Sequence, residues 1–230
     1  MMLDLLYLDN HLLVVNKPAG LLSQADRTGD EDVLSISKKY LKRRFNKPGA
    51  VYLGLVQRLD RPVSGVMALA RTSKAAARLT DQFKHHTTEK IYLALIEGRL
   101  ANEGVCVDHL LKEDRRVRVV DSRHPGSKRA ELSWRRVGYG KGLSLVKVSL
   151  KTGRKHQIRI QLSHRGHPIL GDLRYGAKRE FDGRNLALHC LRLGLLHPTR
   201  REPMSWVARP PDTWGGHFRD EIQGLFAEEI

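Results

Sequence analysis

The apolar residues of this 230-residue chain fall in short runs separated by turn-forming residues, and this pattern favours a strand-rich fold. Residues 3–8 and 11–16 flank the dipeptide Asp9-Asn10, as two antiparallel strands flank a tight turn. Residues 132–137 and 143–150 flank the glycine-containing stretch 138–142 in the same way. Further strand-like runs occupy residues 51–56, 66–70, 91–96, 186–196 and 204–207.

Helical patterns are fewer. Asp32 is placed to cap a helix that runs to about Arg44, and Thr72 or Ser73 is placed to begin a second one. A third helix is predicted over residues 154–164, and the last dozen residues form an acidic amphipathic one. We therefore predict an α+β fold, a mainly antiparallel mixed sheet with flanking helices and loops. No internal repeat or long linker interrupts the chain, so we expect a single domain over residues 1–230.

The charge indicates a polyanionic partner. The chain carries 41 Lys and Arg residues against 25 Asp and Glu, a formal net charge of +16. Such an excess attracts phosphate backbones and draws affinity from counterion release. The 40% share of hydrophobic residues is typical of a globular protein and not of a disordered basic tail. A ribosome-associated or merely soluble basic protein shows the same excess, so charge alone does not settle the function.

The two cysteines, Cys106 and Cys190, lie far apart in apolar runs without metal-type spacing. We expect buried thiols in a reducing compartment. No apolar run approaches the roughly 20 residues that cross a bilayer, and no secretory signal precedes the first strand. Acidic residues near the N-terminus also argue against a transit peptide. The sequence thus predicts a cytoplasmic protein with no membrane contact.

Residues 58–65, Arg-Leu-Asp-Arg-Pro-Val-Ser-Gly, set one carboxylate in a rigid turn between two strand-like runs. Pro62 biases Arg61 towards an extended backbone. Asp60 lies between Arg58 and Arg61, where the arginines can receive a polyanion while the carboxylate acts as a nucleophile. A turn aspartate more often caps its own turn or pairs locally. On these residues alone, catalysis and structure are equally good interpretations.

Two further segments carry candidate chemistry. In a strand over residues 90–94, Lys90 and Tyr92 share one face, where the phenol can stack on a base and move a proton. In the helix over 154–164, Arg159 lies at the edge of the apolar stripe, where it can meet a carboxylate with two hydrogen bonds. A solvated tyrosine and a solvated basic face are the plain alternatives. His156, His164 and His167 lack the partners of a metal site.

Taken together, these segments resemble the RluA-type family of RNA pseudouridine synthases. The chain matches the family's RLDxxxSG motif at 58–65, KxYxA at 90–94, and TGRxHQIR with GHPIxGD at 152–159 and 166–172. Residues 16–20 and 186–189 also match, so that the resemblance spans nearly the whole chain. It implies the pseudouridine synthase catalytic fold and isomerisation of specific uridines in structured RNA, either tRNA or rRNA. It also implies that no cofactor, metal or energy source is used.

The resemblance assigns roles to the matching residues. Asp60 corresponds to the catalytic aspartate, Tyr92 to the active-site tyrosine, and Arg159 to the arginine that pairs with the aspartate. Arg58 corresponds to the residue that enters the RNA helix after the target uridine flips out, which physically suits a planar cation. The basic segment 112–129 resembles an RNA-gripping insertion, which we predict to be a loop. We therefore expect RNA contacts from Arg58, Arg61, Lys90, Arg154, His156, Arg115, Arg116 and Arg118.

Two positions depart from the family pattern. Gln57 stands where the family usually has His, and Val63 where it usually has Thr. The chain begins directly at the catalytic region, so we expect no separate N-terminal RNA-binding domain, and a monomer is the simplest assembly. A non-catalytic RNA-binding or RNA-folding factor on the same fold is the alternative function. Retention of Asp60, Tyr92 and Arg159 argues against it, because a pure binder has no need of an anionic side chain beside phosphate.

Overall fold

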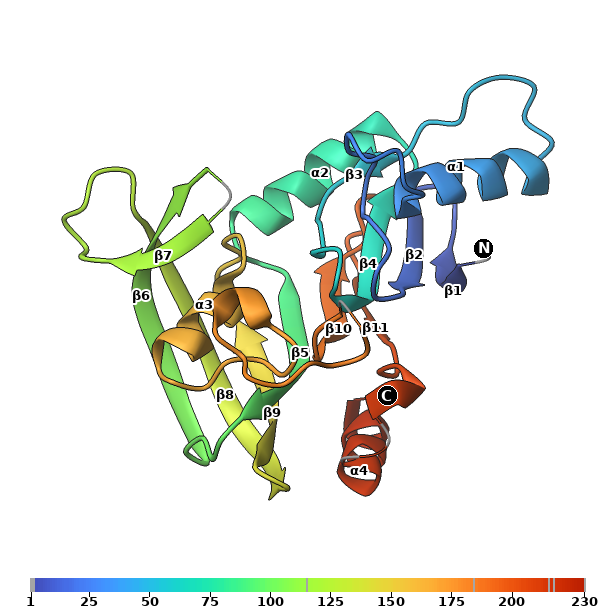
Figure 1. The fold of residues 1–230 in the computed structure, drawn as a ribbon. Helices are drawn as coiled ribbons and strands as arrows, with labels where there is room; N and C mark the ends of the chain where they lie inside the picture. Colours follow the sequence, from blue (N-terminus) through green and yellow to red (C-terminus); the bar gives the residue numbers. More distant parts are fainter. Residues whose placement is uncertain (1–2, 115, 184, 215, 217, 230) are drawn as a thin grey trace.

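The computed structural model describes residues 3–114, 116–183, 185–214, 216 and 218–229. Within these residues one mixed sheet has the strand order β1-β2-β4-β10-β5-β9-β8-β6-β7, with β3 paired to β4 and β11 to β10 (Figure 1). Strands β4 and β10 run parallel, and the other described pairs are antiparallel. The strands are β1 Asp4–Leu8, β2 Leu12–Lys17, β3 Gly54–Leu55, β4 Ser64–Ala70, β5 Glu89–Glu97, β6 Glu103–Glu113, β7 Arg116–Val120, β8 Lys128–Gly140, β9 Leu143–Leu150, β10 Leu188–Leu196 and β11 Pro203–Val207.

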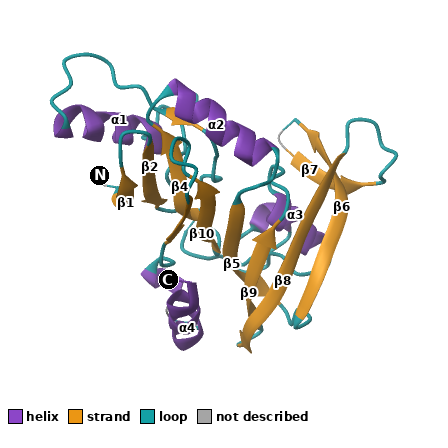
Figure 2. Cartoon of the chain, turned by 180° about the vertical axis from the view of Figure 1, so that it is seen from behind, coloured by secondary structure: helices purple, strands orange, loops and turns teal. Residues whose placement is uncertain are grey.

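Helices flank this sheet, as the α+β prediction requires. Helices α1 and α2 lie along its β1-β2-β4 half, and α3 lies beside β6 and β7 (Figures 1 and 2). The predicted caps are present: Asp32 Oδ1 accepts from the Ser35 amide at 3.0 Å, and Thr72 Oγ1 accepts from the Ala75 amide at 3.1 Å. No described helix is long and apolar enough to span a bilayer. The helices are α1 Val33–Arg44, α2 Ser73–Lys84, α3 Gln157–His164 and α4 Arg219–Glu229, with 3₁₀ turns η1 Leu173–Tyr175 and η2 Asp212–Trp214.

Strand β5 is buried on both of its faces. Tyr92, Ala94 and Ile96 face the larger core, which is formed with α1, α2 and α3. Leu93 and Leu95 face the second core, which α4 covers. The alternation predicted for this strand is confirmed, but the face that carries Tyr92 is packed and not open. Cys106 and Cys190 are buried free thiols, as expected.

Gly65 explains how the turn at residues 58–63 is attached to the middle of the sheet. Its φ is +119°, and a Cβ atom there would lie 2.3 Å from the Cys190 carbonyl oxygen of β10. Only glycine permits this approach, which lets β4 run beside β10 directly after the turn. Ser64 reinforces the contact, because its hydroxyl lies 2.8 Å from Nδ1 of the buried His189. The turn is therefore fixed to two central strands.

Three local predictions were wrong. The run 51–56 forms a strand only at β3, since its other residues make no ladder to β4. The segment 112–129 is not a plain loop: most of it belongs to β6, β7 and β8, because Val117 and Val119 of β7 pack on Leu110 and Ala130. Helix α3 begins at Gln157 and not at 154, because the Gln157 side chain accepts hydrogen bonds from Thr152 Oγ1 and the Arg154 amide and closes a loop ahead of it.

Candidate active site

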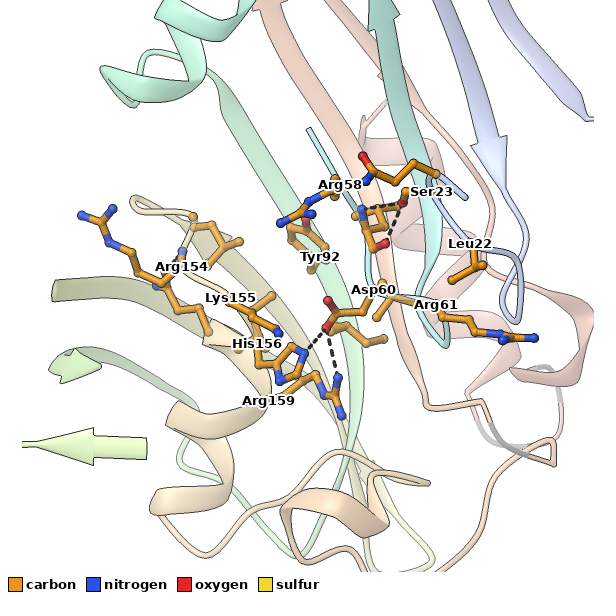
Figure 3. A pocket seen from close by; sticks show the side chains of 18 of the residues that line it. Leu22, Ser23, Arg58, Asp60, Arg61, Tyr92, Arg154, Lys155, His156 and Arg159 are labelled. Carbon is orange, nitrogen blue, oxygen red and sulfur yellow. Dashed lines mark hydrogen bonds and ion pairs between the residues drawn. The ribbon is translucent and has the colours of Figure 1, made fainter. Parts of the chain in front are cut away.

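The three motif segments meet at one cavity of about 460 Å³ (Figure 3). The turn 58–63, the loop 22–26, strand β5 and the segment that leads into α3 form its walls. Its lining carries four arginines and one lysine against the carboxylates of Asp26 and Asp60. The lining residues are Leu22, Ser23, Gln24, Ala25, Asp26, Arg58, Leu59, Asp60, Arg61, Val63, Tyr92, Leu150, Gly153, Arg154, Lys155, His156, Gln157, Ile158, Arg159 and Leu188.

Asp60 faces this cavity and is held through one of its oxygens. Its side chain is 32% exposed. Oδ2 lies 3.0 Å from Arg159 Nη1 and 3.5 Å from His156 Nε2 (Figure 3). The other oxygen, Oδ1, accepts no hydrogen bond from any residue that the structure describes. The carboxylate thus has a fixed orientation and one oxygen available to a bound molecule.

Arg159 joins Asp60 to a second carboxylate. Its Nε and Nη2 donate to Asp172 Oδ2 and Oδ1 at 2.6 and 2.8 Å, and both side chains are buried. Burial alone would lower the Arg159 pKa, but the hydrogen bonds and charges of Asp172 and Asp60 outweigh it and raise the pKa. The prediction that Arg159 meets a carboxylate with two hydrogen bonds is confirmed. The carboxylate with two hydrogen bonds, however, is that of Asp172. Asp60 accepts one hydrogen bond, from the remaining nitrogen, Nη1.

His156 contacts Asp60 from the loop before α3, where its φ of +53° places it in the left-handed region. Its Nδ1 lies 2.7 Å from the Tyr175 hydroxyl. Burial lowers the His156 pKa to about 4; the Asp60 charge opposes this shift, and the nearby Arg159 and Lys155 add to it. The imidazole is therefore neutral at pH 7. It can donate Nε2–H towards Asp60 while Nδ1 accepts from Tyr175.

Tyr92 forms part of the cavity wall and is 9% exposed. Burial raises its pKa well above the ordinary value of 10, and the neighbouring Cys190 and Asp60 raise it further. Tyr92 thus stays a neutral phenol at physiological pH. Lys90 does not join it: the Lys90 ammonium is buried and donates to the Thr88 carbonyl and hydroxyl at 3.2 and 2.9 Å. The expectation that Lys90 shares the face open to RNA is not met.

Lys17 and Ser23 hold the turn 58–63 in place through hydrogen bonds. The sequence did not single out either residue. The Lys17 ammonium is buried and donates to the carbonyls of Pro18, Leu21 and Arg61, with the shortest distance, 2.6 Å, to Leu21. Burial lowers the Lys17 pKa to about 7 against the opposing charge of Asp60. The Ser23 hydroxyl lies 2.7 Å from the Leu59 carbonyl. The match at residues 16–20 was the available signal for Lys17; Ser23 had none.

The other predicted RNA-contacting residues divide by position. Arg58, Arg61 and Arg154 line the cavity, and Arg61 also pairs with Asp30 at 2.8 Å. Arg116 and Arg118 are exposed on β7 and do not line the cavity. Arg118 is further engaged by two hydrogen bonds to Glu113. The prediction for Arg115 lies outside the described residues.

Of the two departures from the family pattern, only Val63 reaches the cavity, where it is buried and offers an apolar wall. Gln57 instead donates to the Val66 carbonyl at 3.4 Å. Within the described residues, no group of three His, Cys, Asp or Glu side chains is arranged to hold a metal ion.

Comparison with known proteins shows which family this chain belongs to. Residues 11–164 match the family model described as RNA pseudouridylate synthase. The chain is 32% identical to tRNA pseudouridine synthase C of Salmonella typhi, over 93% of this chain and 87% of that protein. It is also 32% identical to ribosomal large subunit pseudouridine synthase D of Yersinia pestis, over 91% of this chain and 68% of that protein.

Two solved structures of human proteins have a similar fold. The human RNA pseudouridylate synthase domain containing 1 matches with a TM-score of 0.72 and 25% identity, over 92% of this chain and 84% of that one. The human RNA pseudouridylate synthase domain containing 4 shares the fold, with a TM-score of 0.76 and 23% identity over 97% and 93% of the two chains. The present chain belongs to the RluA-type family of RNA pseudouridine synthases, isomerases that act on RNA.

Proposed function

We propose that this chain isomerises uridines in tRNA or ribosomal RNA, with Asp60 as the catalytic carboxylate. The observation that carries this proposal is the contact of Arg159 with Asp60 at 3.0 Å inside a cavity lined with cations. The substrate class follows the relatives, whose names specify tRNA and the large ribosomal subunit. Both RNAs are folded polyanions that complement a chain of net charge +16.

The target uridine must leave its stack to reach the cavity, at a cost of a few kcal/mol. Arg58 is exposed at the cavity wall. Its side chain enters the RNA helix and fills the space that the flipped uridine leaves. Arg61 and Arg154, together with Lys155, are placed to hold the neighbouring phosphates. The buried side chains of Val63, Ile158 and Leu188 form an apolar lining that excludes water from the bound nucleoside.

The chemistry breaks the bond from N1 to C1′ and forms a bond from C5 to C1′. The hydrogen on C5 leaves as a proton, and N1 gains one. Asp60 promotes the first step through Oδ1, by adding to the ribose or to the uracil ring, while Arg159 and His156 hold Oδ2. The base then turns within the cavity before it rejoins the sugar. Tyr92, a neutral phenol, stacks on the base. Its hydroxyl relays the C5 proton to the Asp60 carboxylate, which is released when C5 bonds to C1′, and Asp60 then passes the proton to N1.

The alternative, an RNA-binding factor without catalysis, fits the site less well. Arg159 forms a buried ion pair with Asp172, and its remaining nitrogen, Nη1, holds Asp60 in place. Burying such a pair carries a desolvation cost that mere RNA binding does not require. We also propose that residues 1–230 work as one catalytic domain, as a monomer in the cytoplasm. One sheet that runs through the described residues from β1 to β11 supports the single domain.

The test maps pseudouridines in total tRNA and rRNA from cells with and without this gene. Cells without the gene are complemented with the wild-type chain or with Asp60→Asn. We expect specific uridines to lose modification without the gene, to regain it with the wild type and to stay unmodified with Asp60→Asn. Identical maps with and without the gene would contradict the proposed activity, and restoration by Asp60→Asn would support the binding factor instead.

A further inference from the structure

A second basic surface lies at the C-terminal end of α1, outside the cavity and outside the segment 112–129. Ten consecutive residues, 38–47, contain six cations and no carboxylate. We call this surface the α1 patch. It consists of Lys38, Lys39, Lys42, Arg43, Arg44 and Lys47, together with the aromatic residue Phe45.

The cations of the α1 patch are unpaired. None of the six makes an ion pair or a side-chain hydrogen bond with any residue that the structure describes. All but Lys38 are exposed. Glu31 lies along the same groove as Lys39 and Arg43 but pairs with neither. A charge cluster without internal partners repels itself, so its cations are available to an external anion.

The segment 112–129 differs in this respect, although sequence alone suggested it as the RNA grip. Several of its cations are already neutralised by nearby carboxylates. Arg118 pairs with Glu113 at 2.7 Å, and Arg123 pairs with Asp121 at 3.0 Å. Arg129 pairs with Glu131 at 2.6 Å. Fewer positive charges per residue therefore remain for phosphate there than on the α1 patch.

An aromatic side chain is exposed within the α1 patch. Phe45 is 42% exposed. The Arg44 and Arg71 guanidiniums lie 5.9 and 4.7 Å from the centre of the Phe45 ring. Exposed rings among arginines are the combination that binds unpaired bases by stacking and phosphates by charge. This favours RNA over an acidic protein as the partner.

The α1 patch is connected to the cavity by a short path. Leu22 lines the cavity and forms a bridge with Asp32, the cap of α1. The twelve residues of α1 then carry the chain about 18 Å further, at 1.5 Å per residue. The exposed Arg27 lies on the connecting loop, and Arg61 ties this loop to the catalytic turn through Asp30. Figure 1 shows α1 running past the β1 edge of the sheet, with the loop 45–53 arching above its far end.

We propose that the α1 patch is a second RNA-docking surface, which binds a part of the folded RNA remote from the target uridine while the cavity holds that uridine. This inference rests on the proposed function. It assigns to the patch a role in selecting the folded RNA, with no role in the chemical step.

The test replaces three exposed lysines of the patch, Lys39→Gln, Lys42→Gln and Lys47→Gln, in one variant. The control variant carries Lys141→Gln, Lys178→Gln and Arg219→Gln. These three side chains are exposed, line no part of the cavity and make no ion pair or side-chain hydrogen bond with a described residue. Both variants lose three positive charges, so the difference between them isolates the position of the charges. A third variant, Lys39→Arg, Lys42→Arg and Lys47→Arg, keeps the charge.

Two RNAs serve as probes: a folded tRNA or rRNA domain that the wild type modifies, and the isolated stem-loop around its target uridine. We expect the patch variant to bind the folded RNA about tenfold more weakly than the control variant, with a log–log salt slope lower by about 2. Its binding to the stem-loop and its turnover at saturating RNA should match the control. The arginine variant should behave as the wild type does.

Equal affinity of the patch and control variants for the folded RNA would overturn this inference and leave the proposed function intact. A loss of the same size on the stem-loop would also overturn it, because the patch would then act on the target site itself. If the wild type modifies neither RNA, the proposed function fails instead. Equal melting temperatures of all variants confirm that the comparison concerns binding and not folding.

Discussion

Nη1 of Arg159 lies 3.0 Å from Oδ2 of Asp60, although 99 residues separate the two in the chain. The same guanidinium uses its other two nitrogens for Asp172, so that one cation fixes the two carboxylates. Asp60 is therefore oriented by a buried group that is itself immobilised. A preoriented carboxylate with one free oxygen is what a nucleophile in a closed site requires.

Asp172→Asn tests this support. The substitution leaves the buried Arg159 charge without its main partner, and we expect a loss of about 3 kcal/mol in the free energy of unfolding. Turnover should fall as well, because Arg159 no longer holds Asp60 in place. Urea unfolding and single-turnover kinetics measure the two effects. Asp108→Asn is the matched control: Asp108 pairs with Arg165 at 2.8 Å outside the cavity lining, so turnover should not change there. Full activity of Asp172→Asn would contradict the positioning role.

Tyr175→Phe tests the contact of His156 with Asp60. The Tyr175 hydroxyl lies 2.7 Å from His156 Nδ1, and it fixes the tautomer that donates Nε2–H towards the carboxylate. Loss of one such hydrogen bond costs about 1 kcal/mol, so we expect kcat to fall about fivefold at unchanged KM. His156→Gln, which keeps a donor, should retain more activity than His156→Ala. Equal activity of all three variants and the wild type would remove His156 from the site.

Tyr92→Phe separates the ring from the hydroxyl. The ring still stacks on the base, so RNA affinity should stay near that of the wild type. Turnover should fall about a hundredfold, because the hydroxyl that relays the C5 proton is lost. Because burial holds the Tyr92 pKa well above 10, the wild-type rate should show no rise from phenolate formation up to about pH 10. A pH profile of kcat from 6 to 10 checks this, and a rise with an apparent pKa below 10 would contradict the neutral phenol.

The buried His189 side chain should make the folded chain less stable in acid. Burial lowers its pKa from 6.5 to about 4 in the folded chain. On acidification the unfolded chain therefore takes up the proton first, and protonation favours unfolding. Stability should decline between about pH 6.5 and pH 4, by roughly 3 kcal/mol from this residue. Urea unfolding of the wild type and His189→Gln across this range measures the effect. The variant should show a shallower decline; parallel curves would assign the acid sensitivity to other groups.

Local sequence signals predicted much of this molecule. Asp32 and Thr72 marked the starts of α1 and α2, because capping depends on neighbouring residues alone. The alternation along β5 placed Tyr92 on the face that lines the cavity. The meeting of Asp60, Tyr92 and Arg159 in one cavity was expected from the family resemblance, and the geometry brings them together.

What the sequence did not reveal depends on contacts made at long range. Lys90 is exposed or buried according to how the neighbouring strand β10 packs, and no local pattern reports that. Lys17 is buried because carbonyl groups from two separate loops converge on its ammonium. The partner choice of Arg159 was equally hidden, since both carboxylates lie in motifs that fit the same arginine. The ion pair of Arg118 with Glu113 likewise depends on how β6 pairs with β7, which no local pattern reports.

Asp60 carries the proposed reaction, and release of the C5 hydrogen measures its role directly. A tRNA or rRNA substrate labelled with tritium at C5 of its uridines loses the label only when C5 bonds to C1′. In a single-turnover assay, we predict that Asp60→Asn releases no tritium above background and still binds the RNA within about threefold of the wild type. Tritium release by Asp60→Asn at the wild-type rate would contradict the central claim that this carboxylate carries the reaction.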